Sequence, residues 1–284
     1  MDLLTNIKQT SKAALQAGAL QPISTTCETV IEQDCHYQLR ILNNLKRKDN
    51  AEKRLQQAGV TDKNPFLHFD PALYVGDIGH HRCLLNKYNV VDHHLLLVTR
   101  LYQSQNDLLN ANDFTAAATG LQQIDSLVFY NGGTLAGASQ PHKHLQLIPI
   151  ESMPGQQLPL SAQLNRFSST ITTNKQLPFY QSGIAIPEQL LSDTESAGHW
   201  LHQQYLKLLD ALKCKTENGQ ALSAYNLLLT RQWLMIVPRS YEKIDDISLN
   251  SLAFCGAFLV RTQAQAEHLK QVGFSKTLRS VTIN

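Results

Sequence analysis

The stretch from Gly137 to Ile148 constrains the fold more than any other part of this sequence. It joins a turn of small residues to an apolar run in which polar side chains recur at every second position. Because neighbouring side chains of a strand point to opposite faces of a sheet, His142, His144 and Gln146 share one face. A row of imidazole and amide groups that faces loop N–H groups suits nucleophilic attack on a phosphate. The stretch therefore predicts a strand that forms one wall of a phosphate-binding site.

The residues around the two histidines favour a functional role for the pair. A His-x-His pair alone says little, because 11 histidines in 284 residues produce about 0.4 such pairs by chance. Here a glutamine follows at the next alternate position, and the turns Asn131-Gly132-Gly133 and Gly137-Ala138-Ser139 precede the pair. We therefore favour a functional site over a structural one.

The composition is that of an ordinary globular protein. With 284 residues, of which 43% are hydrophobic, the chain can bury a substantial core as one large domain or two coupled lobes. A net charge of +2 and 17% charged residues offer no basic stripe, so we expect no nucleic-acid partner. Five cysteines, scattered and never in C-x-x-C spacing, favour reduced thiols over disulfides or a structural zinc site.

The N-terminal residues lack the basic and apolar blocks of a signal peptide, and no run of about 18 apolar residues occurs. We therefore expect a cytoplasmic protein with no membrane partner. The sequence leaves the oligomeric state open and is compatible with a monomer.

Hydrophobic periodicity predicts an antiparallel α+β sheet with flanking helices. The expected helices cover residues 3–17, ended by Gly18, and 113–123, and the expected strands cover 37–41, 82–85, 94–99 and 126–130. The loop between residues 85 and 94 is too short for a helical crossover, so the two strands that it joins should pair antiparallel.

Prolines at positions 149, 154 and 159 mark the passage to a second half of the chain. In that half, residues 225–230 and 233–237 are typical of a hairpin of buried strands. Ser248 is a suitable N-cap, and we expect it to begin a helix that continues to Val260.

Other catalytic signatures are absent from the sequence, which has no G-x-x-x-x-G-K-[ST] loop, no H-E-x-x-H and no G-x-S-x-G. A metal-dependent site of the cupin type is the rival interpretation, because two imidazoles on one strand face suit a transition metal. Such a site normally includes a carboxylate a few residues on, whereas Glu151 lies beyond the strand. The basic cluster Lys46-Arg47-Lys48 is either a solvated turn or a phosphate clamp, and the residues alone leave this open.

Further motifs accompany the histidine stretch. They are Gly18-Ala19-Leu20, Leu85-Asn86-Lys87, Val128-Phe129-Tyr130-Asn131, Tyr225-Asn226-Leu227-Leu228-Leu229-Thr230, Trp233, Val237-Pro238-Arg239-Ser240 and Asn250-Ser251. Together the series, which extends along most of the chain, resembles the diadenosine tetraphosphate phosphorylases, or ATP adenylyltransferases, of the histidine-triad superfamily, relatives of galactose-1-phosphate uridylyltransferase. The resemblance implies a histidine-triad (HIT-like) antiparallel sheet in which residues 1–165 form the catalytic half with the H-x-H-x-Q motif, and residues 166–284 complete the fold and the nucleotide site.

The same resemblance implies roles for individual residues. His144 matches the nucleophile, His142 the histidine before it, and Gln146 the glutamine that replaces the third histidine of the hydrolytic relatives. Lys48 matches a phosphate-contacting lysine. The other implied substrate-binding residues are Leu85, Asn86, Asn131, Gly137, Ala138, Ser139, Gln140, Gln146, Asn250, Ser251, Leu252 and Arg261, the last of which stands where fungal members have lysine.

The implied activity is phosphorolysis of diadenosine tetraphosphate to ATP and ADP through an adenylyl-histidine, reversible as ATP adenylyl transfer. The implied partners are therefore a dinucleoside polyphosphate, ATP, ADP and phosphate. A neutral imidazole can attack phosphorus, and Gln146 can donate a hydrogen bond to a phosphoryl oxygen without acting as an acid or a base. We expect a divalent cation, magnesium, with the substrate phosphates and no structural metal. A non-catalytic dinucleotide sensor and the His-x-His metal enzyme are the alternatives.

Overall fold

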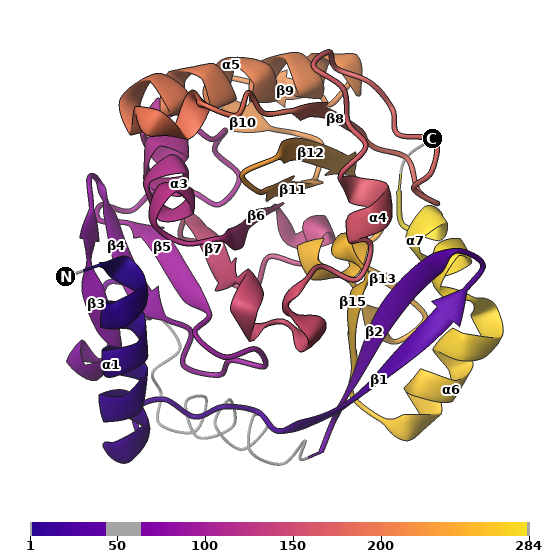
Figure 1. The fold of residues 1–284 in the computed structure, drawn as a ribbon, viewed down its shortest axis with the longest axis horizontal. Helices are drawn as coiled ribbons and strands as arrows, with labels where there is room; N and C mark the ends of the chain where they lie inside the picture. Colours follow the sequence, from indigo (N-terminus) through magenta and orange to yellow (C-terminus); the bar gives the residue numbers. More distant parts are fainter. Residues whose placement is uncertain (1, 44–63, 283–284) are drawn as a thin grey trace.

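A computed structural model describes residues 2–43 and 64–282. In these residues an eight-stranded sheet with the order β3-β4-β5-β7-β6-β11-β12-β8 forms the centre, and every neighbouring pair in it is antiparallel (Figure 1). Its strands are β3 (Tyr74–Ile78), β4 (His81–Leu85), β5 (Leu95–Thr99), β6 (Ser126–Gly132), β7 (His144–Pro149), β8 (Ser182–Ala185), β11 (Tyr225–Leu229) and β12 (Trp233–Pro238). The pairing of β6 with β11 joins the two halves of the chain in one sheet.

One face of this sheet is covered by helices. They are α1 (Leu3–Gln16), α3 (Ala111–Gln123) and α5 (Thr194–Ala211). The apolar side chains of these helices pack in one core with Leu145 and Leu147 of β7. Helix α3 begins at a capping box of Asn110 and Asp113, and Gly120 allows it to lie close to Leu147. The side chains of β7 that alternate with these leucines are therefore on the other face.

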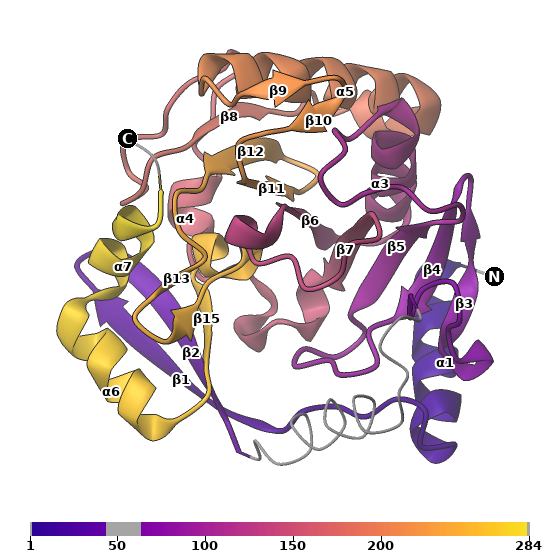
Figure 2. The same ribbon diagram turned by 180° about the vertical axis from the view of Figure 1, so that it is seen from behind.

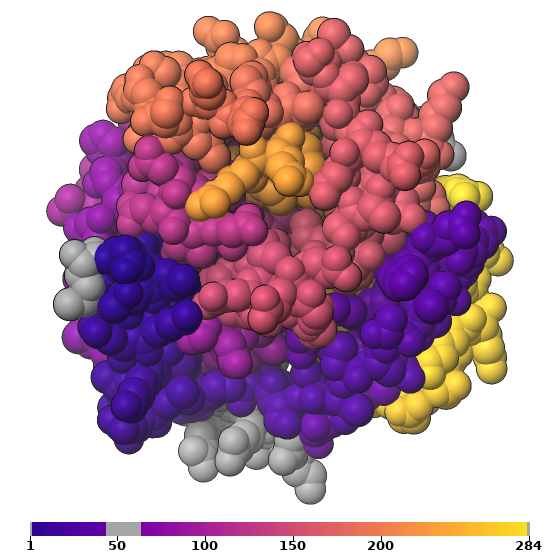
Figure 3. Space-filling model, in the orientation of Figure 1, coloured from indigo at the N-terminus to yellow at the C-terminus, as the bar shows by residue number. Residues whose placement is uncertain are grey.

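A smaller layer covers part of that second face. It contains a three-stranded sheet of β1 (Thr25–Glu32), β2 (Cys35–Leu42) and β15 (Ala257–Val260), and the helices α6 (Gln263–Val272) and α7 (Phe274–Ser280). Tyr37 of β2 stacks on Phe274 of α7 at 4.8 Å between ring centroids. Figures 1 and 2 show from both sides that the strands near the N-terminus lie beside the helices at the C-terminus. In Figure 3 the indigo β1–β2 segment and the yellow C-terminal helices form adjacent parts of one surface.

Short elements make up the connections. They are the 3-10 helices η1 (Pro71–Leu73), η2 (Thr134–Ala136), η3 (Ile150–Ser152), η4 (Pro154–Gln156), η5 (Leu190–Ser192) and η6 (Ser251–Cys255), the helical turn α4 (Ser161–Leu164), and the hairpins of β9 (Thr216–Glu217) with β10 (Gln220–Ala221) and β13 (Lys243–Ile244) with β14 (Ile247–Ser248). No helix in residues 2–43 and 64–282 is long and apolar enough to cross a membrane.

Most of the predicted elements are confirmed, including the first helix, the antiparallel pairing of β4 with β5 and the β11–β12 hairpin. The predicted helix from Ser248 to Val260 is wrong. Asn250, not Ser248, caps the short helix η6, which ends at Gly256 with a φ of +93°. The chain then forms β15, which pairs in parallel with β2 and buries Phe258 and Val260. Burial against a distant strand outweighs the local helical pattern here.

Candidate active site

His144 is the first residue of β7 and lies opposite Val98 of β5. Its Nδ1 lies 2.8 Å from the main-chain oxygen of His142. A carbonyl oxygen only accepts, so Nδ1 carries the proton and the lone pair of the neutral ring is on Nε2. Burial lowers the pKa of His144 to about 4, which keeps the ring neutral near neutral pH. In the described residues Nε2 has no hydrogen-bond partner, so this ring has the form that a nucleophile requires.

The ring of His142 differs from that of His144, because both of its nitrogens form hydrogen bonds. Nε2 donates to the main-chain oxygen of Thr99 at 2.8 Å, and Nδ1 then accepts from Nδ2 of Asn64 at 2.9 Å. Burial also lowers the pKa of His142. With its lone pair directed at Asn64, this ring does not share a ligand position with His144. The described residues contain no group of three His, Cys, Asp or Glu side chains placed to hold a metal ion.

Apolar side chains surround the two imidazoles. The ring centroid of Phe66 lies 5.0 Å from that of His144 and 5.8 Å from that of His142. Phe66 belongs to a small cluster with Leu84, Leu96 and Val98 on the same sheet face. His144 is 5% exposed as a result. The removal of water by these side chains explains the low pKa of His144.

Gln146 lies at the end of a chain of hydrogen bonds that starts in the loop after β4. Nδ2 of Asn86 is 3.2 Å from Nδ1 of His94, and Nε2 of His94 is 2.9 Å from Oε1 of Gln146. Burial lowers the pKa of His94 to about 4. His94 was not predicted from the sequence as a site residue. Alternation along residues 94–99 places it on one face with Leu96, but the register of β5 against β7, which brings it to Gln146, is not visible in the sequence.

A buried polar network lies on the adjacent strands. Oδ1 of Asn131 on β6 accepts from Oγ of Ser251 at 2.7 Å and from Nδ2 of Asn226 at 2.9 Å. Nη1 of Arg239 donates to Oδ1 of Asn226 at 2.7 Å. Burial lowers the pKa of Arg239 to about 10, so the guanidinium stays charged near neutral pH. The network connects β6, β11 and β12 to η6, and it places a fixed positive charge near the loop that follows β6.

That loop carries the predicted turn of small residues. Gly137 has a φ of +88°, and a Cβ there would lie 2.9 Å from Cβ of Asn250. The carbonyl of Ala136 accepts from Asn226 at 2.8 Å, which fixes the loop to the network. Ser139 is exposed and Gln140 half-buried in the segment that leads to His142. The loop is thus fixed at its start, and the Ser139 and Gln140 side chains at its end make no hydrogen bond to the rest of residues 2–43 and 64–282.

Not every predicted site residue is close to His144. Leu85 packs in the core on the helix-covered face, so only its backbone can face the site. Leu252 packs against the core beneath η6, and its N–H donates to Asn250 at 3.0 Å. Arg261 is exposed after β15, and no described hydrogen bond or ion pair connects it with the histidine strand. Lys48 lies outside the described residues.

Lys143 occupies the opposite face from the two histidines. Its Nζ donates to the main-chain oxygen of Leu108 at 2.9 Å and lies 3.3 Å from Oδ2 of Asp113. Oδ1 of Asp113 is 2.8 Å from Nε2 of His81. This ion cluster is buried beneath the helices. The cluster anchors the Lys143 side chain on the helix-covered face of the sheet, on the opposite side from His142 and His144.

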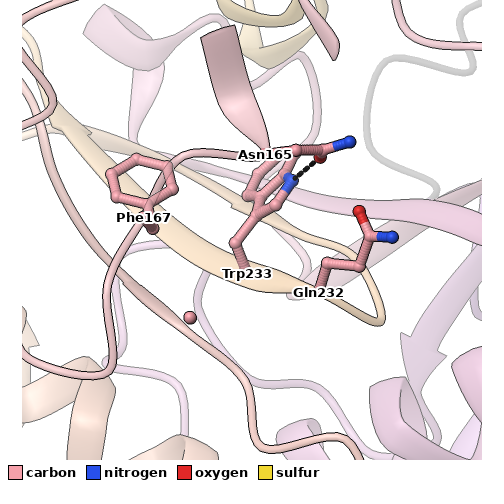
Figure 4. A pocket seen from close by; sticks show the side chains of 5 residues that line it. Asn165, Phe167, Gln232 and Trp233 are labelled. Carbon is pink, nitrogen blue, oxygen red and sulfur yellow. Dashed lines mark hydrogen bonds between the residues drawn. The ribbon is translucent and has the colours of Figure 1, made fainter. Parts of the chain in front are cut away.

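Figure 4 shows a pocket at the edge of the sheet that ends in β8. It is lined by Asn165, Phe167, Ala185, Gln232 and Trp233, around the β12–β8 edge. The indole N–H of Trp233 donates to Oδ1 of Asn165 at 3.0 Å within this lining. His144 begins β7, near the middle of the sheet, and His142 lies just before that strand.

The whole fold matches solved structures of yeast Ap4A phosphorylase Apa2. The complex of Apa2 with AMP superposes with a TM-score of 0.80 at 26% identity, over 98% of this chain and 96% of that chain. The complex of Apa2 with Ap4A has a TM-score of 0.77 at 24% identity, over 99% and 97% of the two chains. The fold is therefore the α+β fold of these nucleotide-binding phosphorylases, with its large antiparallel sheet and flanking helices.

Sequence comparison identifies the family. Residues 1–166 match the Ap4A phosphorylase N-terminal domain, and residues 175–284 match the ATP adenylyltransferase C-terminal domain. The chain is 29% identical over 238 residues to diadenosine 5',5'''-P1,P4-tetraphosphate phosphorylase 2 of Saccharomyces cerevisiae, covering 74% of this chain and 72% of that protein. Protein APA1 of the same yeast is 32% identical over 200 residues, covering 64% and 61% of the two chains. The chain belongs to the Ap4A phosphorylase and ATP adenylyltransferase family of enzymes.

Proposed function

We propose that this protein phosphorolyses diadenosine tetraphosphate to ATP and ADP through a covalent adenylyl-histidine at His144, and that the reverse reaction makes it an ATP adenylyltransferase. One observation carries the proposal. The buried His144 ring is neutral, donates Nδ1–H to a main-chain oxygen and leaves Nε2 without a partner in the described residues. The family and the AMP and Ap4A complexes of the yeast relative support the substrate class.

In the first step, Nε2 of His144 attacks the α-phosphorus of one adenosine. The N–P bond forms as the bond from phosphorus to the bridging oxygen breaks, and the electron pair leaves on ATP. The ring becomes positively charged as it bonds to phosphorus. The main-chain oxygen of His142, which lies 2.8 Å from Nδ1 and accepts its proton in a hydrogen bond, stabilises that charge. The main chain of His142 thereby contributes more directly than its imidazole.

In the second step, an oxygen of inorganic phosphate attacks the same phosphorus. The N–P bond breaks, its electron pair returns to Nε2, and ADP leaves. Gln146 and the amides and hydroxyl of the 137–140 loop hold the phosphoryl oxygens in both steps. A divalent cation such as magnesium, bound with the substrate phosphates, would neutralise part of the charge on the leaving polyphosphate.

The proposal is tested by product analysis and intact mass. Diadenosine tetraphosphate without phosphate should add one adenylyl group to the wild type and none to His144→Ala. With phosphate, the wild type should release ATP and ADP, and turnover of His144→Ala should fall by roughly four to six orders of magnitude. Binding of the dinucleotide with neither adduct nor products would instead support the non-catalytic sensor.

A further inference from the structure

The residues His94, Asn86 and Gln146 form a hydrogen-bonded chain whose direction is set by the backbone. The chain begins at the N–H of Tyr88, which lies 3.3 Å from Oδ1 of Asn86. The two following contacts, from Asn86 to His94 and from His94 to Gln146, measure 3.2 Å and 2.9 Å. Gln146, at the end of this chain of hydrogen bonds, lies two residues after His144 on the same face of β7.

The orientation of each group follows from the one before it. A backbone N–H can only donate, so Oδ1 of Asn86 accepts and its Nδ2 is the atom that faces His94. Nδ1 of His94 therefore accepts, and the proton of the neutral ring is on Nε2. This proton can be donated only to Oε1 of Gln146. The oxygen of the Gln146 amide is thus committed to His94, and its NH2 group points elsewhere.

The direction of the chain holds only while His94 is neutral. The residue is 8% exposed, and its ring lies 5.8 Å from that of Phe129. Burial lowers its pKa to about 4, so the ring does not take up a second proton near neutral pH. The side chain of the half-buried Gln146 has no other hydrogen-bond partner among the described residues, so His94 alone of these residues fixes the orientation of its amide.

We propose that His94 is a positioning residue that turns the NH2 group of Gln146, rather than its oxygen, toward the adenylyl group on His144. The inference rests on the function proposed above. An NH2 group can hold a phosphoryl oxygen but cannot accept a hydrogen bond from an attacking water. His94 therefore controls whether the intermediate reacts with phosphate or with water.

Hydrolysis would follow if the amide of Gln146 were free to rotate. Its oxygen would then accept a hydrogen bond from water and orient that water toward phosphorus. The water oxygen would bond to phosphorus, and the N–P bond would break with its electron pair returning to Nε2 of His144. AMP would leave with one proton of the water on its phosphate, and the other proton would be released to solvent. Phosphate attack on the same intermediate gives ADP, so the ratio of AMP to ADP measures the orientation of Gln146.

The experiment compares His94→Leu, which removes the donor, with His94→Gln, which can place an NH2 group near the position of Nε2. The adenylyl-enzyme of each is isolated and mixed with buffered phosphate, and AMP and ADP are separated by chromatography. The AMP to ADP ratio should rise about tenfold in His94→Leu, the effect of one lost hydrogen bond, and stay within about threefold of the wild type in His94→Gln. A purely structural role would slow both products and leave the ratio unchanged.

An unchanged ratio in His94→Leu, or an equal rise in both variants, would overturn the inference. A measurement on the wild type does not depend on how the variants fold. In 15N-labelled protein, imidazole shifts should show His94 as the Nε2–H tautomer, and the Nδ1–H tautomer would also overturn it. Failure of the proposed function can be distinguished from failure of this inference, because the wild type itself would then yield no adenylyl-enzyme and no ADP.

Discussion

Replacement of Asn226 by alanine tests the buried network that positions the loop beside His144. The Nδ2 group donates to Oδ1 of Asn131, to the carbonyl of Ala136 and to Oγ of Ser251, and Oδ1 accepts from Arg239. All of these groups lie in the protein interior. The variant leaves the Ala136 carbonyl without its side-chain donor and removes one of the acceptors of a buried guanidinium.

The magnitude follows from the kind of bonds that are lost. A neutral hydrogen bond contributes about 1 kcal/mol and a bond to a charged group about 1.5–3 kcal/mol, and unpaired buried groups add a desolvation penalty. Asn131 keeps its bond from Ser251, which limits the loss. We expect Asn226→Ala to lower the free energy of unfolding by about 3–5 kcal/mol.

The assay is urea unfolding followed by tryptophan fluorescence, with kcat/KM for diadenosine tetraphosphate measured in parallel. Asn112→Ala is the matched control, because Asn112 is exposed in the first turn of α3 and its removal should change the free energy by less than about 0.5 kcal/mol. A loss below about 1 kcal/mol for Asn226→Ala, or an equal loss in both variants, would refute the argument that this network holds the loop.

Three further predictions concern the histidine and its loop. The pKa of His144 is lowered to about 4, so its share of the stability is complete above the unfolded value near 6.5 and is lost as pH falls toward 4. Urea unfolding at several pH values checks this, and a gain in stability over that range would contradict it. Phe66→Ala exposes the ring and should raise the pKa of His144 toward 6.5 in an NMR titration, whereas an unmoved pKa would show that Phe66 does not desolvate it. Gly137→Ala should lower kcat/KM roughly tenfold to a hundredfold, because its Cβ collides with Asn250. Gly155→Ala, with a similar φ of +70° and nothing within 4 Å, should leave kcat/KM unchanged, and an equal loss in both would exclude the collision as the cause.

The sequence predicted the parts of the site that follow from local pattern. Alternation in the histidine strand placed His142, His144 and Gln146 on one face, and the opposite face carries Leu145 and Leu147 in the helix-covered core. Backbone conformation was also visible, since Gly137 has the positive φ that a tight turn needs.

The remaining parts depend on pairings between distant segments. His94 lies within hydrogen-bond distance of Gln146 only because of the register of β5 against β7. Arg239, which follows β12, lies beside Asn226 because β12 pairs with β11. The helix predicted from Ser248 failed for the same reason, because β15 gains its stability from β2. The hydrogen bonds of the His142 ring could not be predicted either, because its partners Thr99 and Asn64 are distant in the sequence.

Mapping the adenylyl group to a residue and an atom tests whether Nε2 of His144 is the nucleophile. The wild type is mixed with diadenosine tetraphosphate in the absence of phosphate, digested at alkaline pH, and sequenced by tandem mass spectrometry. We predict a single adenylyl group on His144, labile to acid and stable to base as a phosphorus–nitrogen bond requires. In 15N-labelled protein, NMR should show 31P–15N coupling to Nε2. An adenylyl group on His142 or any other residue, or coupling to Nδ1 of His144, would contradict it.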